Sequence, residues 1–310
     1  SAAYGGTTLV LWTGFSHGYF GLAVLLSCSL HRSFRMINIV GNTRMHKNSS
    51  LALLYCAQHG SADADPIMLL HGGSFTGRSW ANVTERLPEW RCLTPDLPGH
   101  GESQHRPLVS LNAAADDLAE LIEKRFDGEP LNIVGLSLGG YIGLSLMARH
   151  PRLVRRALLS GIHIGAMPYA GAMVVLMNLM SPFMASRWFR ERNARMLGVT
   201  DFTLVSNSDG SANVSAATAR AIGRLVAVFD VEETLGLIKT PTLAVAGGCE
   251  HASILHSLKT LETRMPDCVA KVVPGMGHGW CVADPDLFAQ CVHAWFSGEA
   301  LPQQLVDGFS

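Results

Sequence analysis

The sequence predicts an α/β fold in which helices cover both faces of a mostly parallel, doubly wound sheet. Short apolar runs of strand length alternate along the chain with segments of helical periodicity, which is the pattern of such a sheet. The chain has 310 residues, of which 48% are apolar and 16% are charged. This composition supports a large core and excludes intrinsic disorder and a highly charged coiled coil.

The predicted strands are apolar runs that are bounded by turn-forming residues. They are LALLYCAQ (51–58), PIMLLHG (66–72), RCLTPDL (91–97), LNIVGLS (131–137), RRALLSG (155–161), PTLAVAG (241–247) and AKVVPG (270–275).

Two of the connecting segments carry clear helix signals. Ser110 can cap a helix whose apolar residues fall on one face and which ends near Gly128. Those apolar residues are Leu111, Ala114, Leu118, Leu121 and Ile122. A second helix is expected to begin just after Ser137 and to end by Pro151.

The gap between the strands at 155–161 and 241–247 is much longer than a crossover needs, which predicts an inserted helical cap over about residues 165–238. Within it, residues 164–186 carry no Lys, Arg, Asp or Glu, and four methionines recur at helical spacing (Met173, Met177, Met180 and Met184). This stripe fits a buried helix face or the wall of an apolar substrate pocket, and the two interpretations are compatible.

The segment 1–35 forms a second apolar surplus, because no charged residue precedes Arg32. Its length would permit a membrane span, but His17, several glycines and the lack of a preceding basic region argue against an anchor or a secretory signal. Met36 directly precedes INIVG, which we interpret as a first strand. We therefore expect 36–310 to be the domain and 1–35 to be an appendage, which could be a truncated leader or upstream sequence translated with the domain, with a membrane anchor as the alternative.

Charge and cysteine content limit the partners of this chain. Its net charge of −1 provides no bulk attraction to nucleic acid or to an anionic membrane, so we expect a small-molecule substrate. The seven cysteines are scattered without C-x-x-C spacing, which suggests neither a disulfide framework nor a zinc site. We expect a cytoplasmic protein, with membrane association through 1–35 as the alternative. The oligomeric state stays open.

The most specific chemical signal is Gly135-Leu136-Ser137-Leu138-Gly139, which lies between a predicted strand and a predicted helix. This is the nucleophile-elbow pattern, in which glycines allow a sharp turn that holds the serine hydroxyl outward at the start of the helix. Serine is a weak nucleophile when free, so a base is required elsewhere in the chain.

Three further motifs follow the expected order, and with the elbow they make residues 50–297 resemble an α/β-hydrolase-fold serine hydrolase. His71-Gly72-Gly73-Ser74 resembles the oxyanion-hole loop of that family. Asp96-Leu97-Pro98-Gly99-His100-Gly101-Glu102-Ser103 resembles its DxPGxGxS turn, and Gly275-Met276-Gly277-His278-Gly279-Trp280 resembles the loop that holds its histidine.

The resemblance implies a role for each position that matches a motif. His278 would be the general base for Ser137, and Gly73 and Leu138 would supply the backbone N–H groups of the oxyanion hole, with Ser74 as the alternative to Gly73. Glu250 would be the acid that orients His278. The family usually has Asp at this position, so the glutamate is a departure that needs its loop to adapt to a longer side chain.

The remaining acids and histidines fit other roles. Asp267, Asp284 and Asp286 are poorer candidates for the acid because they lie beside proline or at expected helix starts. His71 and His100 lie in loop motifs where the histidines of this family are usually structural. His163 begins the predicted cap, and His251 and His256 lie on an expected helix.

These features predict a lidded serine hydrolase that cleaves an ester or related acyl bond in a small, mostly apolar substrate, with no metal and no organic cofactor. A carbon–carbon bond hydrolase or a lactonase of the same fold is an alternative, since fold does not fix the substrate. A ligand receptor that retains the pocket but turns over slowly or not at all is a further alternative, motivated by the Glu250 departure.

Overall fold

A computed structural model describes residues 52–165 and 214–308 of the chain, together with scattered positions between 171 and 195. These residues belong to one compact unit that spans Leu51–Ser310. The predicted appendage 1–35 and the predicted strand INIVG lie outside the described residues.

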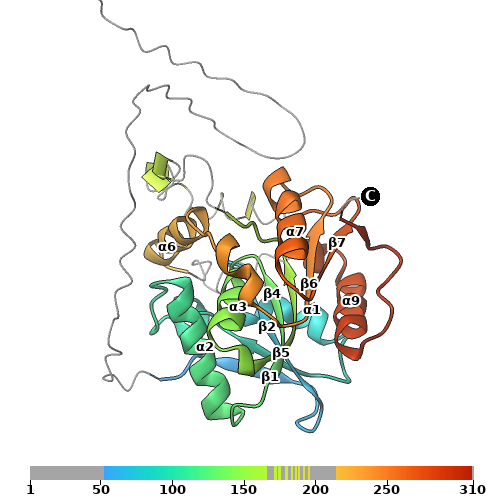
Figure 1. Cartoon of the computed structure of the whole chain (residues 1–310). Helices are drawn as coiled ribbons and strands as arrows, with labels where there is room; N and C mark the ends of the chain where they lie inside the picture. Colours follow the sequence, from blue (N-terminus) through green and yellow to red (C-terminus); the bar gives the residue numbers. More distant parts are fainter. Residues whose placement is uncertain are drawn as a thin grey trace, which may run out of the picture. The chain divides into compact units, whose positions relative to one another are not determined.

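The described strands form one eight-stranded sheet in the order β1-β3-β2-β4-β5-β6-β7-β8 (Figure 1). The six inner strands run parallel, whereas β1 pairs antiparallel with β3, and β8 pairs antiparallel with β7. Their bounds are β1 Cys56–His59, β2 Pro66–Leu70, β3 Arg91–Pro95, β4 Leu131–Leu136, β5 Val154–Ser160, β6 Thr242–Gly247, β7 Cys268–Val273 and β8 Val306–Asp307. The predicted α/β class with a mostly parallel sheet is confirmed.

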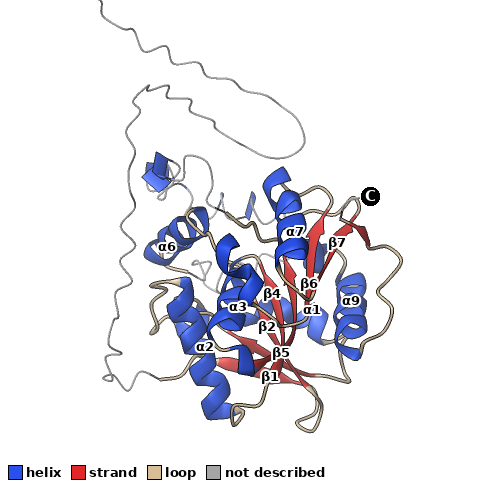
Figure 2. Ribbon diagram, in the orientation of Figure 1, coloured by secondary structure: helices blue, strands red, loops and turns tan. Residues whose placement is uncertain are grey.

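The inner strands are buried on both sides, as β2 illustrates. Ile67 and Leu69 belong to one hydrophobic cluster, while the alternate residues Met68 and Leu70 belong to the other. Helices α2 (Leu111–Arg125), α3 (Leu138–Arg149) and α7 (Ala252–Arg264) contribute to the second cluster. Helices α1 (Ala81–Thr84), α8 (Trp280–Ala283) and α9 (Pro285–Ser297) contribute to the first, so helices cover both faces (Figure 2). Short 3₁₀ turns occupy Gly77–Trp80, Gly101–Ser103, Pro151–Leu153 and Glu232–Leu237.

The helix signals in the sequence match the observed ends of α2 and α3. The Ser110 side chain accepts a hydrogen bond from the Ala113 N–H at 3.0 Å, which caps α2. Gly128 follows this helix with a φ of 69°, and its N–H returns to the carbonyl of Ile122. Helix α3 begins directly after Ser137 and ends two residues before Pro151.

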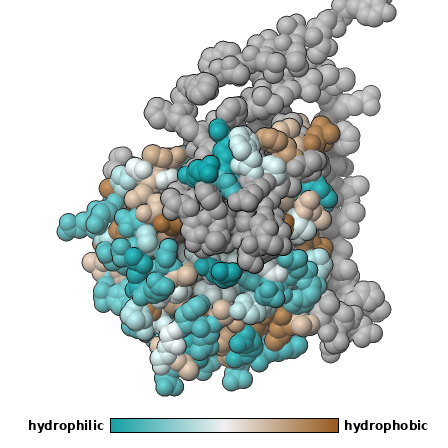
Figure 3. Space-filling model, turned by 180° about the vertical axis from the view of Figure 1, so that it is seen from behind, coloured by the Kyte–Doolittle hydropathy of each residue, from teal (hydrophilic) through white to brown (hydrophobic). Residues whose placement is uncertain are grey.

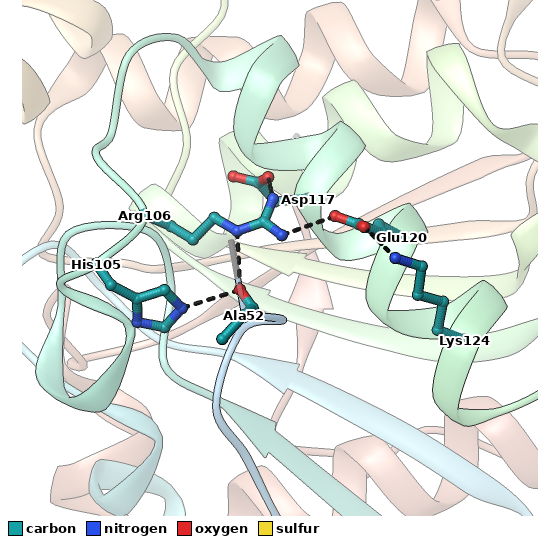
Figure 4. A network of polar contacts seen from close by, with 6 residues as sticks. All are labelled: Ala52, His105, Arg106, Asp117, Glu120 and Lys124. Carbon is teal, nitrogen blue, oxygen red and sulfur yellow. Dashed lines mark hydrogen bonds and ion pairs between the residues drawn. The ribbon is translucent and has the colours of Figure 1, made fainter. Parts of the chain in front are cut away.

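The edges of the sheet differ from the prediction. The strand predicted over 51–58 is shortened to Cys56–His59, and the two-residue strand β8 was not predicted. Ahead of β1 the Tyr55 carbonyl still accepts the Asp96 N–H at 3.0 Å, and before that residue side chains hold the chain. Arg106 donates to the carbonyl oxygen of Ala52 and forms ion pairs with Asp117 at 2.5 Å and Glu120 at 2.9 Å on α2 (Figure 4). This network fastens the start of the described chain to α2.

Between β5 and β6 lies the segment 161–241, called here the β5–β6 insert. Its described part includes α6 (Ala216–Ala227) and the 3₁₀ turn Glu232–Leu237. Much of the cap predicted over 165–238 lies outside the described residues, as do Met173, Met177 and Met184. Met180 is described and is 42% exposed, so the interpretation of the methionine stripe as a buried helix face is wrong at that position.

The face shown in Figure 3 is mainly hydrophilic where it is described, with hydrophobic residues in separate patches. None of the helices in the described residues combines the length and the apolar character that crossing a membrane requires.

Candidate active site

Ser137 lies at a sharp turn between β4 and α3. Its φ of 52° is unusual for a residue with a side chain and stores roughly 1–3 kcal/mol of strain. Neighbouring backbone leaves no space beside it: a Cβ at Gly139 would lie 2.2 Å from the carbonyl oxygen of Leu70, and one at Gly135 would lie 2.7 Å from that of Gly139. The local geometry is that of the elbow that the two glycines predict.

Backbone hydrogen bonds join this turn to the strand on each side of it. The Ser137 N–H donates to the Ser160 carbonyl at 2.8 Å, and the Gly139 N–H donates to the His71 carbonyl at 3.1 Å. Since β2, β4 and β5 are parallel neighbours, their carboxyl ends lie at one edge of the sheet. Ligands of open α/β sheets bind at this edge.

Glu250 and His278 form a hydrogen-bonded pair at the same edge, after β6 and β7. His278 Nδ1 lies 2.6 Å from Glu250 Oε2, and the Glu250 carboxylate is completely buried while the imidazole is 24% exposed. The other carboxylate oxygen accepts the Gly247 N–H at 3.0 Å. Glu250 also donates its own backbone N–H to the Gly247 carbonyl, which closes a tight turn. The glutamate side chain, which is longer than that of aspartate, folds back onto this turn.

Gly161 links this pair to the serine turn. Its φ is 68°, and a Cβ at this position would lie 2.6 Å from His278 Cε1 and 3.4 Å from Glu250 Oε2. The preceding residue, Ser160, accepts the Ser137 N–H. Within the described residues, Ser137 and His278 form no direct hydrogen bond, and free enzymes often tighten such contacts only when substrate binds.

His71 is a structural part of the loop after β2. Its Nε2 accepts the Leu97 N–H at 3.0 Å, so the ring proton is on Nδ1 and is donated to the Gly72 carbonyl at 2.8 Å. Complete burial, with a smaller contribution from His100, holds the pKa of His71 well below its usual value. The neutral ring fixes the loop that carries Gly73.

Three backbone N–H groups at this edge are candidates for an oxyanion hole. In the described part of the chain, the N–H groups of Gly73, Ser74 and Leu138 donate no hydrogen bond. Gly73 and Leu138 are the pair that the sequence predicts, and Ser74 is the alternative to Gly73. Each of the three can therefore donate a hydrogen bond to a ligand oxygen.

The DxPGxGxS turn supports the site without entering it. Asp96 is buried and accepts the Gly77 N–H at 2.7 Å and the Glu102 N–H at 2.9 Å. Burial raises the pKa of Asp96, and these two backbone hydrogen bonds oppose the shift. Ser103 accepts the Tyr55 N–H at 2.9 Å, so the turn also holds the chain ahead of β1.

The acids that the sequence ranked below Glu250 have other contacts. Asp284 caps α9 by accepting the Leu287 N–H at 3.0 Å. Asp286 is exposed and pairs with Arg86 at 2.6 Å. Asp267 is also exposed, and its carbonyl accepts the Thr242 N–H.

Sequence reasoning missed several residues that surround the site. Trp280, completely buried beside His278, donates its indole N–H to Ser160 Oγ at 2.9 Å. His163 Nδ1 lies 2.5 Å from the hydroxyl of Tyr141, and burial is the main cause that lowers the pKa of His163. No local signal predicts such pairs, because their members are far apart in the sequence.

The sheet order, the helices on both faces and the serine turn after a central strand together define an α/β-hydrolase fold. The chain belongs to the alpha/beta hydrolase family, whose model matches residues 67–291. Hydrolysis is the class of chemistry that this family and site indicate.

Individual proteins that the chain resembles have modest sequence identities to it, between 22% and 38% in three examples. An AB hydrolase superfamily protein of Gibberella zeae is 29% identical over 258 residues, covering 79% of this chain and 83% of that protein. A pimeloyl-acyl-carrier-protein methyl ester esterase of Neisseria meningitidis is 38% identical over 90 residues, covering 29% of this chain and 33% of that protein. A solved esterase of Thermogutta terrifontis shares the fold with a TM-score of 0.63 and 22% identity, covering 79% of this chain and 93% of that one.

Proposed function

We propose that this protein is a serine hydrolase that cleaves an ester or related acyl bond in a small-molecule substrate through Ser137, Glu250 and His278. The observation that carries the proposal is the 2.6 Å hydrogen bond between His278 and the buried Glu250 carboxylate, beside Gly161 and the strained turn of Ser137. A carboxylate, an imidazole and a strained serine at one sheet edge are the parts of a nucleophilic triad.

The hydrogen bond to Glu250 determines which nitrogen of His278 can act as a base. With the Nδ1 proton donated to the carboxylate, Nε2 is left with its lone pair available. Nε2 would remove the proton of Ser137 Oγ as that oxygen attacks the acyl carbon, and would then pass it to the leaving alcohol. Water attack on the resulting acyl-enzyme, assisted by the same nitrogen, would release the acid and restore Ser137.

Backbone N–H groups would stabilise the negative charge of the tetrahedral intermediate. Gly73 and Leu138 are the proposed donors, with Ser74 as the alternative to Gly73, and each donor is worth about 2.7–4 kcal/mol of barrier in comparable sites. The hydrogen bond from the Gly139 N–H to the His71 carbonyl supports this pairing, because it ties the start of α3 to the loop that carries Gly73.

The names of relatives support acyl chemistry. The Neisseria protein is named a methyl ester esterase and the Thermogutta protein an esterase, which favours ester cleavage over the carbon–carbon alternative. The pairing of Glu250 with His278 also weakens the receptor alternative, since that alternative was motivated by the glutamate.

A fluorophosphonate probe and a p-nitrophenyl ester panel of increasing acyl length test the proposal. The wild type should be labelled and should hydrolyse at least one ester, while Ser137→Ala should lose both activities. Ser145→Ala is the matched control, because Ser145 lies buried on the same helix, α3, and should keep both. Equal labelling of the wild type and Ser137→Ala would refute the role of Ser137, and a folded wild type with neither activity would favour the receptor.

A further inference from the structure

One face of helix α6 crosses the carboxyl edge of the sheet. At the start of the helix, Thr218 lies against the loop after β3, because a Cβ at Gly99 would lie 2.8 Å from its Cγ2. One turn later, Ile222 lies against the loop after β2, because a Cβ at Gly73 would lie 3.1 Å from its Cγ2. Helix α6 therefore starts over the end of β3 and passes to that of β2, the next strand in the sheet.

The end of this face lies beyond β4, next to the segment that follows β5. Phe229, just after α6, packs against Tyr141 of α3 with ring centroids 4.9 Å apart, and α6 itself lies beside α3 (Figure 1). The Tyr141 hydroxyl contacts His163, which follows β5. Burial lowers the pKa of His163, and the backbone of Val226 opposes that shift from α6. Since the sheet order is β3-β2-β4-β5, the part of α6 between Ile222 and Val226 passes the carboxyl end of β4.

These contacts come from a single stripe of the helix. Thr218, Ile222 and Val226 follow one another at four-residue spacing, which places their side chains on one face. Ile222 lies in the middle of the stripe, is only partly buried, and packs against the hydrophobic cluster that includes Leu138. An apolar side chain is therefore partly exposed beside Gly73, one of the two proposed oxyanion donors.

The proposed reaction assigns a direction to each substituent of the acyl carbon bound to Ser137. The oxyanion would point toward Gly73, after β2, and the leaving oxygen toward His278, which follows β7 and would give it a proton. In the sheet order these two residues lie on opposite sides of β4. The acyl chain takes the remaining direction, away from the sheet and from His278, and α6 passes there with Ile222.

We propose that Ile222 contacts the acyl group of the substrate and sets how bulky that group can be next to the scissile carbonyl. The inference rests on the proposed function and deepens it, because it assigns the acyl side of the ester to α6. One methylene more or less in an apolar site changes kcat/KM by about 10–200-fold, so a single truncated side chain should have a measurable effect.

Two ester series that place a branch on opposite sides of the carbonyl test the inference. The acyl series consists of p-nitrophenyl acetate, isobutyrate and pivalate, and the alcohol series consists of n-butyl, sec-butyl and tert-butyl acetate. Ile222→Val and Ile222→Ala should raise the ratio of kcat/KM for pivalate to that for acetate progressively, by about tenfold or more in Ile222→Ala. The ratios within the alcohol series should stay as in the wild type.

Val228→Ala is the matched control, because Val228 directly follows α6 and its apolar side chain is exposed. This control should keep the ratios of both series, and circular dichroism checks the folding of every variant. Unchanged acyl ratios in Ile222→Ala would overturn the inference. A change confined to the alcohol series would also overturn it, because Ile222 would then face the leaving group.

The contact between Ile222 and the loop of Gly73 can be tested separately. Gly73 does not have a positive φ, so an alanine there fits the backbone and only its methyl group would meet Ile222. Gly73→Ala should lower kcat/KM, and Gly73→Ala/Ile222→Ala should recover most of that loss. Purely additive effects of the two substitutions would show that the side chains do not meet, which would overturn the inference.

The two proposals fail in different ways. Ester hydrolysis with acyl ratios that do not respond to Ile222 would refute the inference and leave the proposed function intact. Where the wild type hydrolyses no ester, the proposed function fails, and calorimetric titration with acetate, isobutyrate and pivalate decides about Ile222. Ile222→Ala should then bind pivalate about tenfold more tightly than the wild type does. Equal Kd values, or no binding to either protein, would refute the inference.

Discussion

The substitution Glu250→Gln isolates the role of the buried carboxylate, because it keeps the shape of the side chain and removes its charge. The Gly247 N–H donates to Oε1, so the glutamine should keep its carbonyl oxygen there and turn its NH₂ group toward His278 Nδ1. A donor facing Nδ1 requires that nitrogen to be unprotonated, which moves the ring proton to Nε2. The nitrogen that should receive the Ser137 proton is then blocked.

The expected loss is large because the blocked nitrogen is the proposed base. Replacement of a triad carboxylate by its amide lowers kcat by about 10⁴ in a comparable site, equivalent to about 5.5 kcal/mol of barrier. Glu250→Asp should lose less, since the carboxylate remains but is withdrawn by one methylene from a 2.6 Å contact. A misplacement of about 1 Å costs roughly 10²-fold in rate.

The assay is the steady-state kcat for the best p-nitrophenyl ester, with circular dichroism as the check of folding. Glu262→Gln is the matched control, because Glu262 lies on α7 and its carboxylate accepts the Ala270 N–H at 3.0 Å without touching His278. The control should keep wild-type kcat. A Glu250→Gln variant with more than a tenth of wild-type kcat would show that this carboxylate does not set the state of the imidazole.

Three further predictions follow from individual contacts. Gly161→Ala should lower kcat by about 10² or more, because the new Cβ would lie 2.6 Å from His278 Cε1 and displace the ring; unchanged kcat would contradict the contact. Burial lowers the pKa values of His71, His100 and His163, so the unfolded chain binds more protons than the folded one below about pH 6.5. The free energy of unfolding should therefore fall on acidification, by up to about 1.4 kcal/mol per pH unit for each histidine, and a flat profile in urea titrations from pH 7.5 to 5.5 would contradict this. His100→Asn should lower kcat more than His100→Gln, because only the longer glutamine side chain reaches the Gly73 carbonyl.

The parts of the site that the sequence predicts are those with a local signature. The glycines beside Ser137 cannot carry a side chain, because a Cβ at Gly139 or Gly135 would lie 2.2 or 2.7 Å from a backbone oxygen, and that requirement is visible in the sequence as spacing alone. Glu250 could be placed because it follows a predicted strand at the position where the family usually keeps an acid. The hydrogen bond to His278 agrees with that placement.

The missed residues have no such signature. Gly161 directly follows β5, as glycines often follow strands, and only the packing of the loop after β7 shows that it lies against His278. Trp280 was visible as a neighbour of His278, but its bond to Ser160 spans 120 residues. Strand β8 escaped prediction because two residues cannot display a periodicity. Long-range pairing, and not local propensity, decides each of these features.

His100 connects the loop proposed to form the oxyanion hole to the turn after β3, and its two ring nitrogens face two acceptors. Nδ1 lies 2.9 Å from the Pro98 carbonyl and Nε2 lies 3.0 Å from the Gly73 carbonyl. A neutral ring has one proton, and burial lowers the pKa of His100, so at neutral pH only one of these carbonyls receives a hydrogen bond.

The Gly73 carbonyl and the Ser74 N–H belong to one planar peptide and point in opposite directions. A donor at Nε2 therefore fixes where the Ser74 N–H points, and with it the turn that carries Gly73. Glutamine can place its amide near the position of Nε2, whereas the shorter asparagine reaches only that of Nδ1. His100→Gln should keep kcat within a few-fold, while His100→Asn should lose up to the roughly 10²–10³ that removal of an oxyanion donor costs. Equal kcat values in the two folded variants would show that the bond to Gly73 does not position the loop.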